Sequence, residues 1–331
     1  MKVIIQIPCL NEEETLPATL ADLPRAIEGV DELETLVIDD GSTDATVAVA
    51  QECGVDHILR LPNNRGLATG FQAGLDACLK LGADIIVNTD ADNQYRGADV
   101  VELVRPILEG RAEMVVGDRD VQGISHFSPA KKALQRLGSW VVRRLSGAGI
   151  TDSTSGFRAY SREAALQLLV VDNFTYTLES LIQAGKTRIA VEEVPVGTNP
   201  KTRESRLFGS TSTYVRRNGL AILRIYTRYE PLKVFSILAL VALIAALGAW
   251  TPFLYDWIAN GDRDGHIQSL LLGAVLFIAA VQLFALGIIG DILAGQRVMT
   301  QRVFERIRRV ELEVGVESAS EGSKRPDRTP V

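Results

Sequence analysis

Two long apolar stretches in the C-terminal third constrain the fold of this 331-residue chain more than any other feature. The first is VFSILALVALIAALGAWTPFLY, between Lys233 and Asp256, and the second runs from Gly265 to Gly290. Neither stretch contains a charged residue. Since a helix needs about 20 apolar residues to cross the hydrocarbon core of a bilayer, both are predicted to span a membrane. Two buried core helices are the alternative, although core helices of this length usually carry a charge.

Charged residues beside these stretches predict their orientation. Basic residues gather before the first stretch and after the second: Arg216, Arg217, Arg224, Arg228 and Lys233, then Arg297, Arg302, Arg306, Arg308 and Arg309. The loop between the stretches holds three aspartates and only one arginine. By the positive-inside rule, both termini are expected in the cytoplasm and the loop outside. No signal peptide precedes Met1-Lys2-Val3, so the N-terminal region is also expected in the cytoplasm.

The sequences flanking the apolar stretches have the pattern of amphipathic helices. Before the first stretch, apolar residues alternate with arginines at helical spacing, which favours a helix lying on an anionic membrane surface. A helix that simply packs the parts of the chain together is the alternative. The predicted segments are a cytoplasmic domain (1–210), an amphipathic interface helix (211–232), two transmembrane helices with a short external loop (233–295), an amphipathic cytoplasmic helix (296–313) and a disordered tail (314–331).

Composition excludes several classes of function. The chain has 41 acidic and 35 basic residues and a formal net charge of −6, which argues against a general nucleic-acid binder. Its three cysteines, Cys9, Cys53 and Cys78, are too few and too scattered for a disulfide framework or a zinc site. The sequence contains neither G-x-x-x-x-G-K-[ST] nor G-x-G-x-x-G, so it has no P-loop and no dinucleotide fingerprint.

Apolar strands alternate with helices through the N-terminal region. Strands are expected at 3–7, 33–38, 84–87 and 114–116, and helices at 16–27, 45–53, 67–81 and 100–109. This alternation predicts an α/β fold with a mostly parallel sheet covered on both faces. Ligands bind such sheets at the carboxyl ends of the strands.

Acidic residues cluster where two of these strands end. Asp39 and Asp40 end one strand, and Asp90-Ala91-Asp92 follows another. Carboxylates this close repel one another unless a cation lies between them, and Mg²⁺ or Mn²⁺ binds hard oxygen ligands and completes its shell with water and substrate phosphates. A lone D-x-D can also be a pair of solvated acids, but its position after a strand and the second acidic loop favour a metal site.

Four motifs carry a resemblance to a known family. Pro8-Cys9-Leu10-Asn11-Glu12-Glu13, Asp39-Asp40-Gly41-Ser42-Thr43-Asp44 and Asp90-Ala91-Asp92-Asn93-Gln94 resemble, in order, the signatures of family 2 glycosyltransferases with the GT-A fold, and Asp152-Ser153-Thr154-Ser155-Gly156-Phe157-Arg158 resembles their acceptor-side motif. Within this family the chain is similar to the polyprenyl-phosphate, dolichol-phosphate mannose synthase-like enzymes, including those with two C-terminal membrane helices. The resemblance covers residues 3–210 by motif and 230–295 by architecture, and it implies a Rossmann-like GT-A catalytic domain over residues 1–210.

The resemblance assigns site residues one by one. The residues implied to contact the nucleotide sugar are Pro8, Leu10, Glu12, Val37, Asp39, Asp90, Ala91, Arg119, Lys201, Arg203 and Arg206. Asp90, Asp92 and Gln94 would hold Mg²⁺ or Mn²⁺ against the diphosphate. Lys201, Arg203 and Arg206 lie in a run that resembles a mobile basic loop closing on the diphosphate. A basic stretch that is simply solvated is the alternative.

The implied reaction is the inverting, metal-dependent transfer of a sugar from a UDP- or GDP-sugar to undecaprenyl or dolichyl monophosphate at the cytoplasmic face of the membrane. Asp152, Asp92 and Arg119 would be its catalytic residues, and relatives of this kind imply a homo-oligomer. A processive polysaccharide synthase of the same fold is one alternative, although the sequence has no Q-x-x-R-W. A catalytically inactive membrane scaffold is the other, and the intact acids argue against it.

Asp152 matches the family's candidate general base. A monophosphate has a second pKa of about 6, so near pH 7 its attacking oxygen is largely deprotonated already. We therefore expect Asp152 to orient the acceptor or a basic partner, with Arg158 as one candidate partner. On the sequence alone, the loss of activity in an Asp152→Asn variant is expected to shrink as the pH rises from 6 to 8.

Overall fold

The structure, a computed structural model, describes residues 1–119, 140, 143–144, 149–170, 176–200, 223–224, 226–260 and 266–315. The chain divides into two compact units. The first comprises Met1–Thr211 with Gln301–Val331, and the second comprises Ser212–Thr300.

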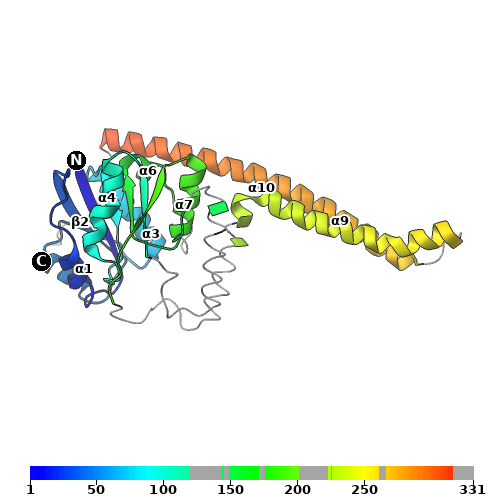
Figure 1. Cartoon of the computed structure of the whole chain (residues 1–331), viewed down its shortest axis with the longest axis horizontal. Coiled ribbons are helices and arrows are strands. Elements are labelled where there is room, and N and C mark those ends of the chain that lie inside the picture. Colours follow the sequence, from blue (N-terminus) through cyan, green and yellow to red (C-terminus); the bar gives the residue numbers. More distant parts are fainter. Residues whose placement is uncertain are drawn as a thin grey trace, which may run out of the picture. The chain divides into compact units, whose positions relative to one another are not determined.

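The first unit is built around a seven-stranded sheet (Figure 1) with the strand order β3-β2-β1-β4-β6-β5-β7. The strands are β1 (Lys2–Cys9), β2 (Glu32–Asp39), β3 (His57–Arg60), β4 (Ile85–Asn88), β5 (Met114–Asp118), β6 (Arg158–Ser161) and β7 (Val191–Pro195). β6 is antiparallel to its neighbours β4 and β5, and the remaining pairs are parallel. The predicted α/β fold with a mostly parallel sheet is confirmed.

Strand β1 continues past the point where the sequence predicts its end. The apolar run predicts a strand that stops before Pro8, but β1 runs through this residue to Cys9. A proline has no backbone N–H, so it cannot donate a hydrogen bond to a neighbouring strand and is tolerated only where no such bond is needed. At this end β1 pairs only with β2, because its pairing with β4 ends at Gln6. Pro8 therefore extends the strand without costing a hydrogen bond to β4.

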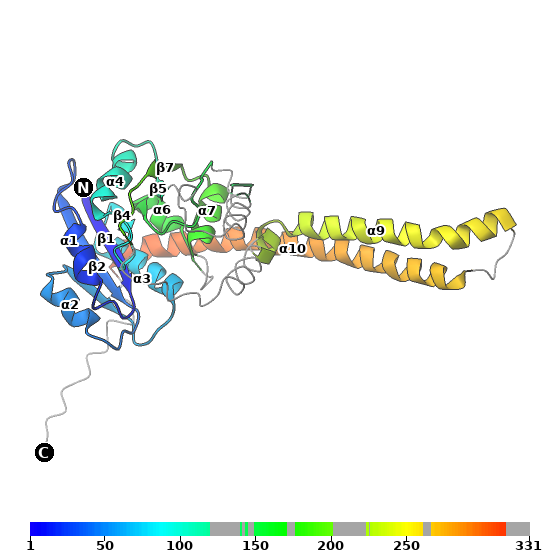
Figure 2. The same ribbon diagram turned by 60° about the horizontal axis from the view of Figure 1, so that its bottom comes forward.

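Helices cover both faces of the sheet (Figures 1 and 2). They are α1 (Leu16–Asp22), α2 (Thr46–Glu52), α3 (Leu67–Lys80), the short η1 (Gly97–Asp99), α4 (Val100–Leu108), α6 (Arg162–Gln167) and α7 (Tyr176–Thr187). On one face Ile5 of β1 belongs to a core with residues of α1 and α4. On the other face α3 packs so closely that a Cβ on Gly74 would lie 2.9 Å from the side chain of Ile38. α3 therefore needs glycine there for packing.

The helix expected over 16–27 is shorter, and the reason is local. α1 ends at Asp22, and the next residue, Leu23, is extended with φ −69° and ψ 144°. Leu23 precedes Pro24, and the ring of a proline disfavours helical backbone in the residue before it. The prediction was wrong beyond Asp22.

The last turns of α10 (Ile267–Val314) belong to the first unit. Arg308 is 5% exposed there, and its guanidinium donates to the carbonyl oxygens of Ala165, Leu166 and Leu168 at 3.0–3.4 Å. It also forms an ion pair with Asp76 of α3. Burial lowers the pKa of Arg308 to about 10, so the group stays charged at neutral pH. Arg308 thus satisfies the free carbonyls at the end of α6.

Replacing Arg308 by glutamine is expected to lower the free energy of unfolding by about 1–3 kcal/mol, because buried carbonyl groups lose their donor. Arg309→Gln is the matched control. Arg309 pairs with Glu163, and both side chains are exposed, so its loss is expected to cost less than about 1 kcal/mol. Urea unfolding of the full chain in detergent measures both, and equal effects would contradict the role given to Arg308.

The second unit contains the two apolar stretches as helices. α9 spans Pro231–Tyr255, η3 spans Asp256–Asn260, and α10 begins at Ile267. Only 11% and 17% of the most apolar windows of the two helices are buried. Core helices of a water-soluble protein would be mostly buried, so this exposure of apolar surface favours membrane spans.

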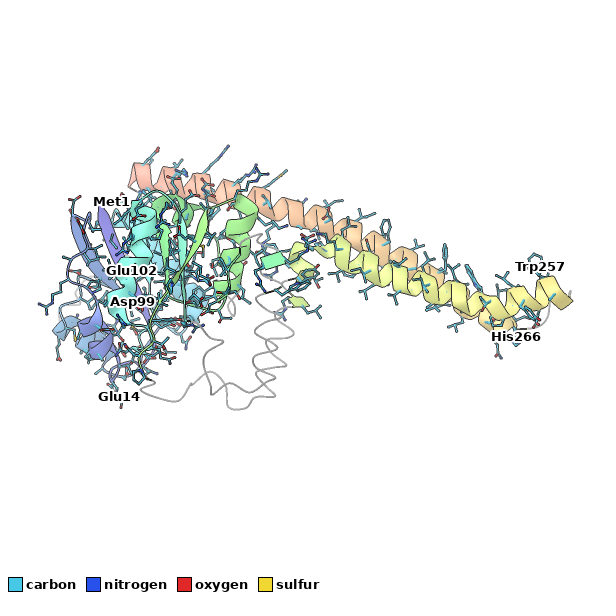
Figure 3. All side chains as sticks on the ribbon, viewed as in Figure 1. Met1, Glu14, Asp99, Glu102, Trp257 and His266 are labelled. Carbon is cyan, nitrogen blue, oxygen red and sulfur yellow. The ribbon has the colours of Figure 1, made fainter. Side chains whose placement is uncertain are left out.

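The two apolar helices pack along each other through small and aromatic residues. The Trp250 indole donates to the Leu270 carbonyl oxygen at 3.2 Å, and a Cβ on Gly287 would lie 3.1 Å from Phe235. Trp257 and His266 lie at the same end of the pair (Figure 3). Small residues that permit such close approach are typical of helices packed in membranes.

Three further predicted segments can be compared with the described residues. The helix expected over 296–313 is not separate, since it continues from the second apolar stretch within α10. Of the expected interface helix at 211–232, the structure describes 223–224 and 226–232, and the predicted tail lies outside the described residues after Gly315.

Candidate active site

The loops after β1 and β2 are held together at the carboxyl ends of their strands. Asn11 has a positive φ of 56°, and its side-chain oxygen accepts the backbone N–H of Thr43 at 2.8 Å. Ser42 Oγ accepts the N–H of Asn11 at 2.9 Å. The Glu13 carboxylate accepts the N–H of Ala45 at 2.8 Å. These reciprocal hydrogen bonds join the loop after β1 to the loop after β2, although Asn11 and Thr43 are 32 residues apart in sequence.

The residues expected to contact the nucleotide fall into two groups. Pro8, Leu10 and Glu12 are half-buried at the end of β1 and in the loop after it, and Asp39 ends the neighbouring strand beside Cys9. Val37 is instead fully buried in the hydrophobic core, which assigns its side chain to the core.

Asp39 is 1% exposed, and its carboxylate contacts other residues of the same chain. Its carboxylate accepts the N–H of Ser42 at 2.9 Å and lies 3.6 Å from the guanidinium Nε of Arg60. Asp40 similarly accepts the N–H groups of Arg65 and Gly66 at 2.7 and 2.8 Å. The acids of this motif therefore fix the turns that border the site.

The predicted metal-binding acids lie in the loop after β4. The hydroxyl of Thr19 on α1 donates to the Ala91 carbonyl oxygen at 3.0 Å, which fixes the middle of the loop. The Asp92 carboxylate accepts the backbone N–H of Gln94 at 3.1 Å and its side-chain amide at 2.7 Å. Gln94 therefore orients Asp92 in this structure.

The charge of Asp90 is poorly compensated. Burial, reinforced by the negative charge of Asp92, raises the pKa of Asp90 to about 7 despite the opposing effect of Arg119. Among the residues that the structure describes, no hydrogen bond reaches the Asp90 carboxylate, and no group of three or more His, Cys, Asp and Glu side chains is placed to hold a metal. Carboxylate oxygens are the ligands that Mg²⁺ and Mn²⁺ prefer, and these ions take their other ligands from substrate and water, so the residue types in this loop fit such an ion.

Arg119 and Asp152 form a bidentate ion pair across 33 residues of sequence. Arg119 Nε and Nη2 donate to the two carboxylate oxygens of Asp152 at 2.7 and 3.0 Å, and Nη2 also donates to Thr154 at 3.0 Å. Asp152 is 2% exposed. Burial by itself raises the pKa of Asp152, but the hydrogen bonds and charge of Arg119 outweigh it and hold the pKa below its ordinary value.

Arg158, the partner of Asp152 considered from sequence, has another role. It is fully buried and donates to the carbonyl oxygens of Ser153 and Ser155 at 2.9 and 2.7 Å. It therefore shapes the loop that carries Asp152. The carboxylate of Glu193, on β7, supports the same loop by accepting the backbone N–H of Asp152 at 2.8 Å.

The acceptor-side loop lies directly against the acidic loop. A Cβ on Gly156 would lie 2.8 Å from the Tyr176 hydroxyl and 3.2 and 3.3 Å from the two Asp90 carboxylate oxygens, so a side chain there would displace its neighbours. Asn88 at the end of β4 donates to the Gly156 carbonyl oxygen at 2.8 Å. Tyr95 accepts the Gly156 N–H through its hydroxyl at 2.9 Å. The structure thus brings Asp90, Arg119 and Asp152 to one place.

Sequence reasoning missed the contacts of Asn88, Tyr95 and Glu193. Asn88 and Tyr95 flank the D-x-D closely in sequence, so their position was a usable signal. Glu193 lies 41 residues from Asp152, and no pattern in the sequence links them. The predicted basic loop, with Lys201, Arg203 and Arg206, lies outside the described residues.

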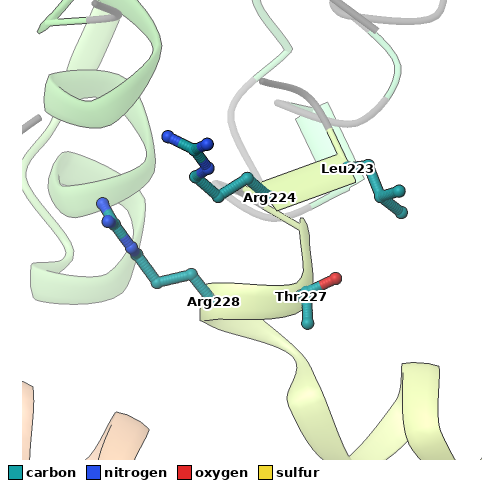
Figure 4. Close-up of a pocket in the computed structure, with 4 residues that line it drawn as sticks. All are labelled: Leu223, Arg224, Thr227 and Arg228. Atoms are coloured by element: carbon teal, nitrogen blue, oxygen red, sulfur yellow. The ribbon is translucent and has the colours of Figure 1, made fainter. Parts of the chain in front are cut away.

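A separate cavity of about 460 Å³ lies in the second unit just before α9, lined by Leu223, Arg224, Thr227 and Arg228. Figure 4 shows both arginine side chains on one side of the segment, with Leu223 and Thr227 on the other. Two guanidinium groups four residues apart in sequence therefore border this cavity.

Comparison with known protein families identifies the family of this chain. The profile of Glycosyl transferase family 2 matches residues 4–169, half of the chain. The chain belongs to this glycosyltransferase family. The matched region includes both acidic loops and the Asp152 loop, so the predicted family and its enzymatic character are confirmed.

Similar proteins extend the match beyond the family profile. Glycosyltransferase AglJ of Haloferax volcanii is 28% identical over 92% of this chain and 97% of its own length. Polyprenol monophosphomannose synthase of Mycolicibacterium smegmatis is 29% identical over 63% of this chain and 82% of its own. Glucosyl-3-phosphoglycerate synthase of Mycobacterium tuberculosis, solved with Mn²⁺ and UDP, is 23% identical with a TM-score of 0.52, covering 67% of this chain and 79% of that one. The predicted GT-A fold is confirmed.

Proposed function

We propose that this family 2 enzyme transfers a sugar, with inversion, from a UDP- or GDP-sugar to a polyprenyl monophosphate at the cytoplasmic face of a membrane. The observation that carries the proposal is the meeting of Asp90, Arg119 and Asp152 at one edge of the sheet in a chain that also has two membrane-length apolar helices. The name of the relative that makes polyprenol monophosphomannose supports the acceptor class.

The chemistry of the donor requires positive charge near its diphosphate. As the bond between the anomeric carbon and the diphosphate breaks, negative charge grows on the leaving group. Arg119 would bind this charge more strongly in the transition state than in the ground state, which accelerates the step. A divalent cation held by Asp90 and Asp92 would supply further charge stabilisation, in line with the Mn²⁺ in the structurally similar synthase.

The nucleotide would lie along the ends of β1 and β2. Pro8, Leu10 and Glu12 are half-buried there, so their remaining surface is open to the base and ribose. Asp39 borders the same place, and Ala91 joins the two metal-binding acids. The basic residues Lys201, Arg203 and Arg206 are proposed to close on the diphosphate.

The acceptor would be a lipid phosphate presented by the membrane. Arg224 and Arg228 just before α9 would attract anionic headgroups, which supports an interface role for residues 211–232. The arginine-rich flanks of both apolar helices favour cytoplasmic termini. A reporter after Val331 is then expected to be cytoplasmic and one near Gly261 external.

A transfer assay tests the function as a whole. Purified full-length protein is mixed with radiolabelled UDP- and GDP-sugars, undecaprenyl or dolichyl phosphate, and Mg²⁺ or Mn²⁺. Label is expected to enter the lipid fraction only when the polyprenyl phosphate and a divalent cation are both present. Elongation of a polysaccharide would support the processive synthase instead, and no transfer from any donor would overturn the proposal.

A further inference from the structure

Tyr95 contacts three separate parts of the active site. It follows Gln94 in the acidic loop and is 6% exposed, with its ring stacked on Phe157 at 5.0 Å between centroids. Its hydroxyl accepts the N–H of Gly156 at 2.9 Å and lies 3.5 Å from Arg119 Nη1. The Arg119 guanidinium carbon lies 5.8 Å from the centre of the same ring.

These contacts complete the orientation of Arg119. Asp152 accepts from Nε and Nη2 of the guanidinium, whereas Tyr95 accepts from Nη1. Each of the three nitrogens therefore has a partner that fixes the plane of the group. A guanidinium held in this way loses little conformational freedom when it binds phosphate.

Tyr95 differs from Asp152 in charge. A tyrosine has an ordinary pKa of about 10, so its phenol is neutral at physiological pH. It therefore orients Arg119 without cancelling its positive charge. A second carboxylate in this position would weaken the attraction of Arg119 for a diphosphate.

We propose that Tyr95 is a positioning residue for sugar transfer: its hydroxyl ties the Gly156 loop to the acidic loop and aims Arg119 at the leaving diphosphate. The inference rests on the proposed function, because it gives Arg119 the role stated there. If the Tyr95 ring served only to pack on Phe157, its hydroxyl would not be needed. Removing the oxygen alone therefore distinguishes positioning of Arg119 from simple packing.

Tyr95→Phe is expected to lower kcat roughly 5- to 20-fold, in the range of one lost hydrogen bond of ordinary strength. The donor KM is expected to stay within about threefold, because oriented charge acts mainly in the transition state. kcat is normalised to sites counted by nucleotide binding, so partial unfolding does not mimic the effect. Unchanged kcat would contradict the inference.

Tyr160→Phe is the matched control. Tyr160 is fully buried, and its hydroxyl lies near Arg158 and Ser180 without a well-formed hydrogen bond within the described part of the chain. Removing the same oxygen from this buried tyrosine is expected to leave kcat and KM within twofold of wild type. A loss in Tyr160→Phe equal to that in Tyr95→Phe would mean that deleting any buried hydroxyl damages the enzyme, and it would overturn the inference.

A double-mutant cycle tests whether Tyr95 acts through Arg119. In an Arg119→Gln background, Tyr95→Phe is expected to lower kcat less than twofold further, because the charge that it orients is gone. The same 5- to 20-fold loss in both backgrounds would show an independent structural role. Absence of transfer by the wild type would count against the proposed function, whereas an active wild type matched by Tyr95→Phe would count against this inference alone.

Discussion

Replacing Asp92 by asparagine is expected to lower sugar transfer by about 10³-fold or more. In the proposed mechanism the two acids after β4 would give a divalent cation its protein ligands, and a neutral amide binds such a hard cation less strongly than a carboxylate. Metal ions contribute several kcal/mol to transition-state charge stabilisation, and about 1.4 kcal/mol corresponds to a factor of ten in rate. The measurement is kcat together with the Mn²⁺ dependence of nucleotide binding, which is expected to weaken in the same variant.

Asp56→Asn provides the matched control for this charge change. Asp56 is exposed and accepts the N–H and hydroxyl of Thr35 at 2.8 and 2.9 Å, and an asparagine oxygen can accept both bonds. Its transfer rate is expected to equal that of the wild type. Full activity of the wild type in EDTA, or of Asp92→Asn at low Mn²⁺, would rule out the metal role of this loop.

The elements predicted correctly from sequence are those specified by local patterns. β2 ends in Asp39, and β4 ends two residues before Asp90; both strands lie within one residue of the bounds that the pattern predicts. Because acids cannot continue a buried strand, they mark its end and the ligand edge of the sheet at once. For this reason the positions of the acidic loops follow from the sequence alone.

The elements that sequence did not predict depend on long-range pairing. β6 (Arg158–Ser161) has no apolar run and begins with a buried arginine. It becomes a strand because β4 and β5 pair with it from both sides. The Arg119–Asp152 pair has the same origin, since no local pattern tells which arginine meets which acid.

The position of Val37 shows a different limit. Its assignment to the nucleotide came from a family motif, but helices cover both faces of the sheet, and Leu36, Val37 and Ile38 are all buried. Motif position therefore predicts the loop that borders the site, whereas the surroundings of a side chain inside the strand depend on the helices packed on both faces.

Asp152→Asn is expected to lower kcat by roughly 10- to 100-fold, which is less than the loss in Asp92→Asn. An asparagine oxygen can still accept one hydrogen bond from Arg119, but the charge-assisted pair is lost. Glu193 holds the backbone N–H of residue 152 regardless of its side chain, so the loop is expected to keep its shape. The activity that remains would come from the cation site and from Arg119 held by Tyr95.

The ion pair also changes the expected pH dependence. Arg119 holds the pKa of Asp152 below its ordinary value, which is near 3.9 in an unfolded chain. The contribution of the pair to stability is therefore complete above that value and is lost only as the pH falls through the lower folded pKa. Between pH 6 and 8 Asp152 stays ionised and is too weak a base to take a proton from the acceptor phosphate.

Because protonation of the acceptor, with a pKa of about 6, affects wild type and variant alike, the ratio of their rates is expected to be the same at pH 6, 7 and 8. This replaces the shrinking loss that the sequence alone predicts. Parallel pH–rate profiles measured at saturating donor would support the positioning role. A ratio that falls toward one at pH 8 would instead identify Asp152 as a general base, and a variant as inactive as Asp92→Asn at every pH would identify a carboxylate that the reaction cannot lose.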